Sequence, residues 1–106
     1  MAGFDDRENT FERKFAHDEE TKFKINARRN RLLGLWAAEQ MGLSGESAEA
    51  YAKQVVRADF DEPGEEDVFR KVWADLQEKK VDVSEHRVRR HMAELLETAR
   101  QQVTSE

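Results

Sequence analysis

The sequence predicts an all-α protein, a four-helix bundle preceded by a mobile N-terminal amphipathic segment. Apolar residues recur every three or four positions along four stretches, which is the spacing of one face of an amphipathic helix. The 106 residues include one proline and five glycines, too few turn residues for a fold of many strands. We expect residues 18–106 to form the bundle and residues 1–17 to be disordered or marginally helical in the free protein.

The first strong helix is expected from about Asp18 to Met41. Its inward face consists of residues at helical spacing: Phe23, Ala27, Asn30, Gly34, Ala37 and Met41. Leucines and Trp36 widen the apolar surface late in the helix, so this half, Trp36 included, should be the most buried. Small residues such as Gly34 allow another helix to approach closely. Gly42 suits the left-handed conformation just past the helix end, with Leu43 folding back onto the last turn.

Two further helices are expected over about 45–58 and 65–79. Ser44 can cap the first of them, and Pro63 and Gly64 prevent it from continuing into the second. Both helices should supply an apolar face to the bundle. The residues expected to face inward are Ala48, Tyr51, Ala52, Val55 and Val56 in the first helix and Val68, Phe69, Val72, Trp73 and Leu76 in the second.

The last helix has the clearest pattern. Ser84 is its expected cap, and Val83 before the cap can pack on Val88 as a hydrophobic staple. The apolar residues that follow keep a regular spacing of three and four: Val88, Met92, Leu95, Leu96, Ala99 and Val103. Short connections between the four helices favour a compact bundle.

Three phenylalanines stand in the otherwise charged N-terminal segment. If the segment is helical, Phe4, Phe11 and Phe15 lie within roughly 40° of one another and form one stripe. This stripe is out of phase with the core face of the following helix, so a straight helix cannot bury both in one seam. The segment has few apolar residues and should be marginal as an isolated helix. Two interpretations remain open: the stripe binds a groove on a partner, or it folds back on its own bundle.

Charge is distributed in blocks. Residues 1–20 have a net charge of −4, residues 21–43 of +4 and residues 44–78 of −6, within a total of −5. This pattern argues against a uniformly basic face for nucleic acid, and it allows oppositely charged segments to attract each other.

The run "KFKINARRNR" nevertheless raises an alternative function, a nucleotide- or nucleic-acid-binding helical module that uses the basic first helix. In that hypothesis Arg28, Arg29 and Arg31, expected on the outside of the helix, contact phosphates. A second cluster that would join them consists of Arg87, Arg89 and Arg90. The other interpretation is a solvated face that forms ion pairs with the acidic second and third helices.

No catalytic site, cofactor or metal site is predicted. Without cysteine there is no disulfide and no thiolate ligand. His17, His86 and His91 lack the spacing of paired ligands and are expected to be solvated. The acidic stretch at residues 59–70 invites comparison with a calcium loop, but Pro63 and Arg70 stand at two of its ligand positions. No apolar run is long enough to span a membrane, and no signal sequence is present, so a cytoplasmic protein is expected.

Three long stretches carry a family resemblance: "FDDRE" at 4–8, "KFAHDEE" at 14–20 and "ARRNRLLGLWAAE" at 27–39. In these stretches, and in shorter ones through Val72, the chain resembles the zeta subunit, the ATPase inhibitor subunit of the F-type ATP synthase of alphaproteobacteria. From about Asp75 onward the similarity is looser and rests mainly on the last amphipathic helix.

The resemblance implies an inhibitor of ATP hydrolysis by the catalytic head of the synthase. In this family a four-helix bundle presents an N-terminal segment that becomes helical between an alpha and a beta subunit, near the gamma shaft, and blocks rotation. The resemblance therefore favours a partner-binding stripe, with phenylalanines as anchors and charges setting the register. The segment it implies comprises Phe4, Asp5, Asp6, Arg7, Glu8, Phe11, Lys14, Phe15 and His17.

The partners implied are the alpha, beta and gamma subunits, with no nucleic acid and no direct insertion into a membrane. The protein would be cytoplasmic and peripheral to the inner membrane through the synthase. We expect a monomer when it is free.

Overall fold

The computed structural model describes the backbone of residues 2–61 and 64–106 and the side chains of residues 19–59 and 64–106. Within these ranges the chain forms four helices and no strand: α1 (Ala2–Gln40), α2 (Gly45–Asp61), α3 (Glu65–Glu78) and α4 (Glu85–Ser105). The predicted all-α, four-helix fold class is confirmed.

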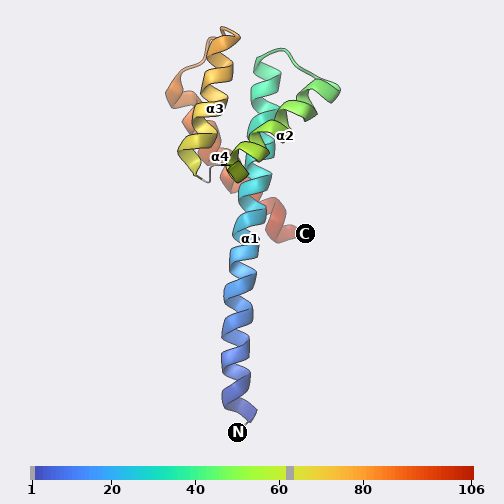
Figure 1. The fold of residues 1–106 in the computed structure, drawn as a ribbon, viewed down its shortest axis with the longest axis vertical. Helices are drawn as coiled ribbons and strands as arrows, with labels where there is room; N and C mark the ends of the chain where they lie inside the picture. Colours follow the sequence, from blue (N-terminus) through green and yellow to red (C-terminus); the bar gives the residue numbers. More distant parts are fainter. Residues whose placement is uncertain (1, 62–63) are drawn as a thin grey trace.

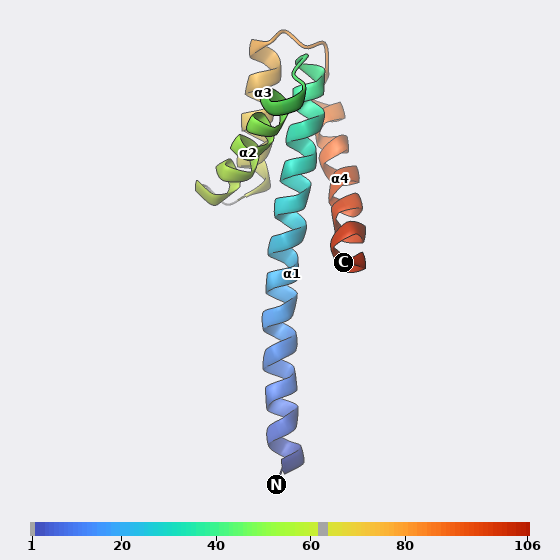
Figure 2. The same ribbon diagram turned by 90° about the vertical axis from the view of Figure 1, so that its right-hand side faces the viewer.

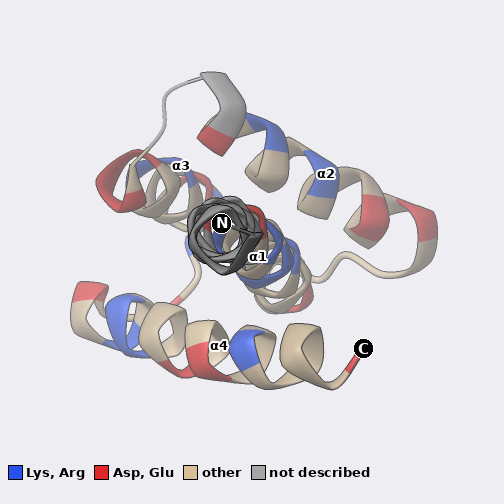
Figure 3. Cartoon of the chain, turned by 90° about the horizontal axis from the view of Figure 1, so that it is seen from below, with Lys and Arg blue, Asp and Glu red and all other residues tan. Residues whose placement is uncertain are grey.

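The helix α1 organises the molecule. Its C-terminal half lies among the other helices, whereas its N-terminal half projects from the bundle in both side views (Figures 1 and 2). The molecule measures 65 × 25 × 23 Å, and a helix of 39 residues accounts for the long dimension at about 1.5 Å per residue. Figure 3, a view along α1, shows α2, α3 and α4 arranged around it. The contacts of α1 are most extensive with α2 and α4.

The helix boundaries agree with the expected ones except at two points. The helix α1 begins at Ala2 rather than near Asp18 and is continuous across the boundary expected between residues 17 and 18. The proposed division into a 1–17 segment and a bundle therefore does not coincide with a break in the helix, and it stays a prediction. The helix α2 runs to Asp61 rather than 58, since nothing before Pro63 prevents its backbone from continuing. Below, residues 2–17 of α1 are called the arm.

The ends of two helices are formed as the sequence predicts. Gly42 has φ +79°, and Leu43 N donates to the carbonyl oxygen of Ala38 at 2.8 Å, the pattern that closes a helix with a left-handed glycine. Ser84 caps α4, because its Oγ accepts a hydrogen bond from Arg87 N at 3.1 Å. These features depend on a few neighbouring residues, which is why the sequence predicts them.

The core lies around the C-terminal half of α1. Its buried apolar side chains come from all four helices: Leu33, Ala37, Ala38, Tyr51, Ala52, Val55, Val68, Phe69, Val72, Leu76, Val88, Met92 and Ala99. A Cβ atom at Gly34 would lie 2.7 Å from the backbone Cα of Ala52. Glycine therefore permits the close approach of α1 and α2 that was predicted for it.

One expectation about the core of α1 is wrong, and a second holds in part. Phe23 was expected to begin the core face but is 55% exposed, and the fully buried aliphatic side chains of α1 begin with Leu33. Phe23 instead lies at an open groove that Val56 and Val103 also line. Trp36 is half-buried at the edge of the core, where its ring stacks on His91 of α4 with centroids 4.3 Å apart.

Candidate functional site

The arm holds every residue that the family resemblance implies for partner binding. The structure describes its backbone as part of α1, while its side chains lie outside the described residues. This applies to Phe4, Asp5, Asp6, Arg7, Glu8, Phe11, Lys14, Phe15 and His17. A helix that leaves the bundle in this way can offer its length to another protein.

Arg28 connects α1 to the end of α4. Its Nη1 donates to Gln102 Oε1 at 2.9 Å, and its Nη2 forms an ion pair with the carboxylate of Glu106. The guanidinium is partly exposed, so water weakens the ion pair. Its geometry nevertheless fixes the Arg28 side chain across the α1–α4 interface.

Arg29 connects α1 to α3. The prediction that it lies on the outside is wrong, since Arg29 is only 3% exposed. It stands one turn before the fully buried Leu33 and therefore shares its face of the helix. Its Nε donates to Asn30 Oδ1 at 2.7 Å, and its Nη1 donates to Glu65 Oε1 at 3.0 Å. Burial of this cation is tolerable because the carboxylate of Glu65 compensates its charge.

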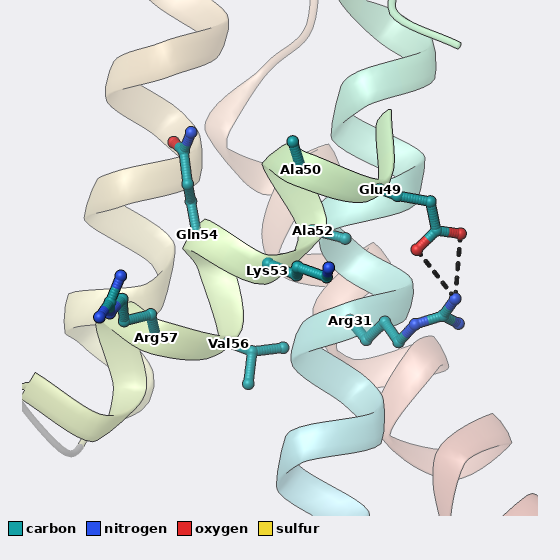
Figure 4. A pocket seen from close by; sticks show the side chains of 8 residues that line it. All are labelled: Arg31, Glu49, Ala50, Ala52, Lys53, Gln54, Val56 and Arg57. Atoms are coloured by element: carbon teal, nitrogen blue, oxygen red, sulfur yellow. Dashed lines mark hydrogen bonds and ion pairs between the residues drawn. The ribbon is translucent and has the colours of Figure 1, made fainter. Parts of the chain in front are cut away.

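Arg31 connects α1 to α2. Its Nη2 donates to both carboxylate oxygens of Glu49, at 3.0 and 3.1 Å, and Figure 4 shows the side chain reaching along the surface toward Glu49. Both partners are about half exposed. Lys53 and Arg57 lie along the same side of α2 and line an adjoining surface pocket.

The three arginines thus have intramolecular acceptors on three different helices. We call these three arginines, together with their acceptors, the collar. Arg28 pairs with Gln102 and Glu106, Arg29 with Glu65, and Arg31 with Glu49. The sequence suggested that the basic run forms ion pairs with the second and third helices. This interpretation is confirmed for Arg31 with Glu49 in α2 and for Arg29 with Glu65 in α3. These partners also weaken the hypothesis that the same arginines bind phosphate.

Arg89 and Arg90, from the second arginine cluster, are paired as well. Arg89 forms two hydrogen bonds to Glu66 at 2.8 and 3.2 Å and lies over the Phe69 ring, 3.9 Å from its centroid. The hydrogen bond from Arg89 lowers the pKa of the Glu66 carboxyl below its ordinary value. Arg90 pairs with Glu94 on the same helix. Among the described residues, Figure 3 shows cationic positions interspersed with acidic ones.

No metal centre emerges from the described part of the chain, where no group of three or more His, Asp or Glu side chains is suitably placed. The expectation that all three histidines are solvated is wrong for His91, which is half-buried against Trp36. His86 is exposed as expected. Asp59, the first acid of the rejected calcium loop, accepts a weak hydrogen bond from Gly64 N at 3.4 Å and so has a part in the turn before α3.

Sequence reasoning missed the acceptors of the collar and a polar link between α2 and α3. In this link Tyr51 donates to Asp75 Oδ2 at 2.8 Å, and Lys71 Nζ donates to the same oxygen at 2.9 Å. Burial, and then the hydrogen bond to Asp75, raise the pKa of the Tyr51 phenol. The block pattern of charge indicated which segments attract each other, but it could not identify the individual pairs.

The fold defines a class of protein, an all-α bundle whose first helix continues well beyond it. Comparison with known proteins makes the assignment specific. A sequence model of the family described as ATPase inhibitor subunit zeta matches residues 1–102, and the chain belongs to this family.

A solved structure resembles this chain over most of its length. A chain whose structure was determined by NMR in solution is 49% identical to this one, with a TM-score of 0.70. The similarity covers 79% of this chain and 95% of that one. The search of curated proteins gave no match. Within the described residues, none of the helices has both the length and the apolar character needed to cross a bilayer.

Proposed function

We propose that the protein inhibits ATP hydrolysis by the catalytic head of an F-type ATP synthase, with its arm bound as a helix between an alpha and a beta subunit. The observation that supports this most is the projection of α1 beyond the bundle in a chain of the ATPase inhibitor subunit zeta family. The family match includes the arm as well as the bundle.

The proposed mechanism is mechanical. A helix of the arm's length extends about 24 Å, enough to occupy a cleft between two subunits. The stripe of Phe4, Phe11 and Phe15 would fill apolar sites there, and the charges beside it would set the register. A helix wedged into an interface that must close during hydrolysis prevents rotation of the gamma shaft. No bond is made or broken by the inhibitor, so the protein would act without being an enzyme and without a cofactor.

The proposed partners are the alpha, beta and gamma subunits, with no nucleic acid and no insertion of the protein into the membrane. The bundle would remain outside the cleft and hold the arm at its entrance. We propose that the free protein is a monomer in the cytoplasm of an alphaproteobacterium, and that it becomes peripheral to the inner membrane when it binds the synthase.

The alternative, phosphate binding by the basic part of α1, has less support. Arg28, Arg29 and Arg31 would have to exchange hydrogen bonds within the protein for contacts with phosphate. For Arg29 this exchange would also leave the acid Glu65 without its buried partner.

An ATPase assay on the cognate catalytic head tests the proposal. The full chain should reduce the hydrolysis rate in a concentration-dependent way, and a variant that lacks residues 1–17 should not. A variant in which Arg28 is replaced by Gln, with the arm intact, should still inhibit. Equal inhibition by the full chain and the truncated one would refute the role of the arm, and no inhibition by either would refute the function.

A further inference from the structure

The position of the collar, between the arm and the core, has a consequence for how the arm is held. Resting on the proposed function, we propose that the collar fixes the direction in which α1 leaves the bundle and so sets the potency of inhibition without contacting the synthase. Arg28, Arg29 and Arg31 are then positioning residues, because they act on the partner only through the arm.

The collar connects one short stretch of α1 to every other helix. Consecutive residues of a helix point about 100° apart, so the three side chains leave α1 in three directions. Arg28 reaches the end of α4, Arg29 the start of α3, and Arg31 the N-terminal part of α2. A change in the tilt of α1 relative to any of the three helices would therefore stretch at least one ion pair.

The three connections differ in how firmly they are held. The Arg29 side chain is buried and donates to Asn30 and to the exposed carboxylate of Glu65. Burial of the cation strengthens its charge-assisted hydrogen bonds relative to those of a fully exposed pair. The pairs of Arg28 and Arg31 are exposed and individually weak. We therefore assign Arg29 to anchoring α1 and the two exposed pairs to limiting its tilt.

Small changes in tilt at the collar become large displacements at the end of the arm. Along a continuous helix, Phe4 lies about 38 Å from Arg29. A tilt of about 10° would displace that end by roughly 7 Å, which exceeds the reach of a side-chain contact, about 4 Å. A helix that must enter a narrow cleft while its bundle remains outside is sensitive to such displacements.

A charge-swap experiment on Arg31 and Glu49 tests the proposal, since both residues are half exposed and the variants should fold. Arg31→Glu and Glu49→Arg should each raise the half-inhibitory concentration about three- to tenfold. The double variant should return it to within about twofold of the unmodified protein. Arg57→Glu is a matched control on the exposed side of α2, because it changes the net charge as Arg31→Glu does but lies outside the collar. It should have little effect.

Direct contact of Arg31 with the synthase or with a phosphate predicts a different pattern. The double variant would then inhibit as poorly as Arg31→Glu, because the cation now at position 49 does not reproduce that contact. Failure of the double variant to recover, or single variants equal to the unmodified protein, would overturn the collar proposal.

A distance measurement separates this proposal from the proposed function. The chain has no cysteine, so spin labels can be attached at Thr21→Cys in α1 and Gln54→Cys in α2. The distance distribution should broaden in either single charge variant and narrow again in the double variant. If the full chain does not inhibit but the distribution changes in this way, the proposed function fails, while the control of the direction of α1 by the collar still stands. If the distribution is unchanged by the charge variants, the collar proposal fails whatever the ATPase assay shows.

Discussion

The two halves of α1 share one backbone conformation and differ in their surroundings. From Arg29 to Ala38 the helix carries the buried face on which α2, α3 and α4 pack, and at Gly34 the approach is so close that only glycine fits. Toward the N-terminus Phe23 is largely exposed, and the arm continues beyond the bundle (Figure 2). Secondary structure alone does not distinguish these halves, whereas contacts with the other helices do.

On the proposed function, stability and partner binding would reside in separate parts of a single helix. A substitution in the bundle half should change the free energy of unfolding, and one in the arm should change inhibition. Variants along α1 test whether stability and inhibition divide in this way.

The largest effect on stability is expected at Leu33, which is fully buried. Leu33→Ala should lower the free energy of unfolding by about 2–5 kcal/mol, because it removes apolar contacts and leaves a cavity. Urea denaturation followed by circular dichroism measures this. Phe15→Ala, a larger truncation in the arm, is the comparison and should cost less than about 0.5 kcal/mol. A similar loss in both variants would abolish the distinction between the two halves.

A smaller loss is expected when Gly34 is replaced by alanine. Helix propensity favours alanine by about 1 kcal/mol, but its Cβ would meet the Ala52 backbone at 2.7 Å. We expect the overlap to prevail and the variant to be less stable by about 1–3 kcal/mol. Thermal or chemical denaturation shows directly whether the variant is more or less stable than the unmodified protein. A stabilised Gly34→Ala protein would mean that α1 and α2 do not approach as closely as described.

The link from Tyr51 to Asp75 predicts how stability depends on alkaline pH. The folded protein holds the pKa of the Tyr51 phenol above its ordinary value of 10.0. Above about pH 10 the unfolded chain loses this proton while the folded protein keeps it, so the stability contribution of Tyr51 declines as the pH rises. Between pH 10 and 11 the unmodified protein should lose about 1 kcal/mol more than Tyr51→Phe does. If the unfolding free energies of the two proteins decreased equally between pH 10 and 11, the raised pKa of Tyr51 would be contradicted.

The smallest effect on stability is expected from deleting the arm. A chain that begins at Asp18 keeps the core residues of all four helices, so its unfolding free energy should differ by less than about 0.5 kcal/mol. Its unfolding should remain cooperative in a thermal melt. A large decrease in melting temperature would show that the arm contributes to the core.

Local sequence signals predicted much of the fold, and the three-dimensional arrangement supplied the rest. The glycine at position 42 and the cap at Ser84 could be predicted because each involves residues within one turn. The burial of Arg29 could not, since it depends on where the start of α3 lies beside α1. The exposure of Phe23 has the same cause: helical periodicity identifies a face, but it does not tell where the neighbouring helices end.

The candidate site was predictable to a different degree. The three phenylalanines of the arm stood out against a charged background, and the function proposed for them came from the family resemblance rather than from their spacing. In the sequence, the only sign of the collar was the opposite net charge of residues 21–43 and 44–78. Its pairing of Arg28 with Glu106, 78 residues apart, depends on the antiparallel course of α1 and α4.

The ATPase assay on the catalytic head needs a control for general changes to the arm. On the helical wheel Glu12 lies about 80° from the centre of the phenylalanine stripe, and Glu12→Gln changes one charge without removing an apolar group. Charges at a solvated rim contribute little to binding, so this variant should inhibit nearly as well as the unmodified protein.

The most direct test of the account is the inhibitory potency of Phe11→Ala and Phe15→Ala. Each ring buried in the complex should contribute about 1.5–3 kcal/mol, so each variant should raise the half-inhibitory concentration roughly ten- to a hundredfold, with an unchanged unfolding free energy. Inhibition of unchanged potency after the loss of both rings would contradict the account, because the binding site would then lie outside the phenylalanine stripe.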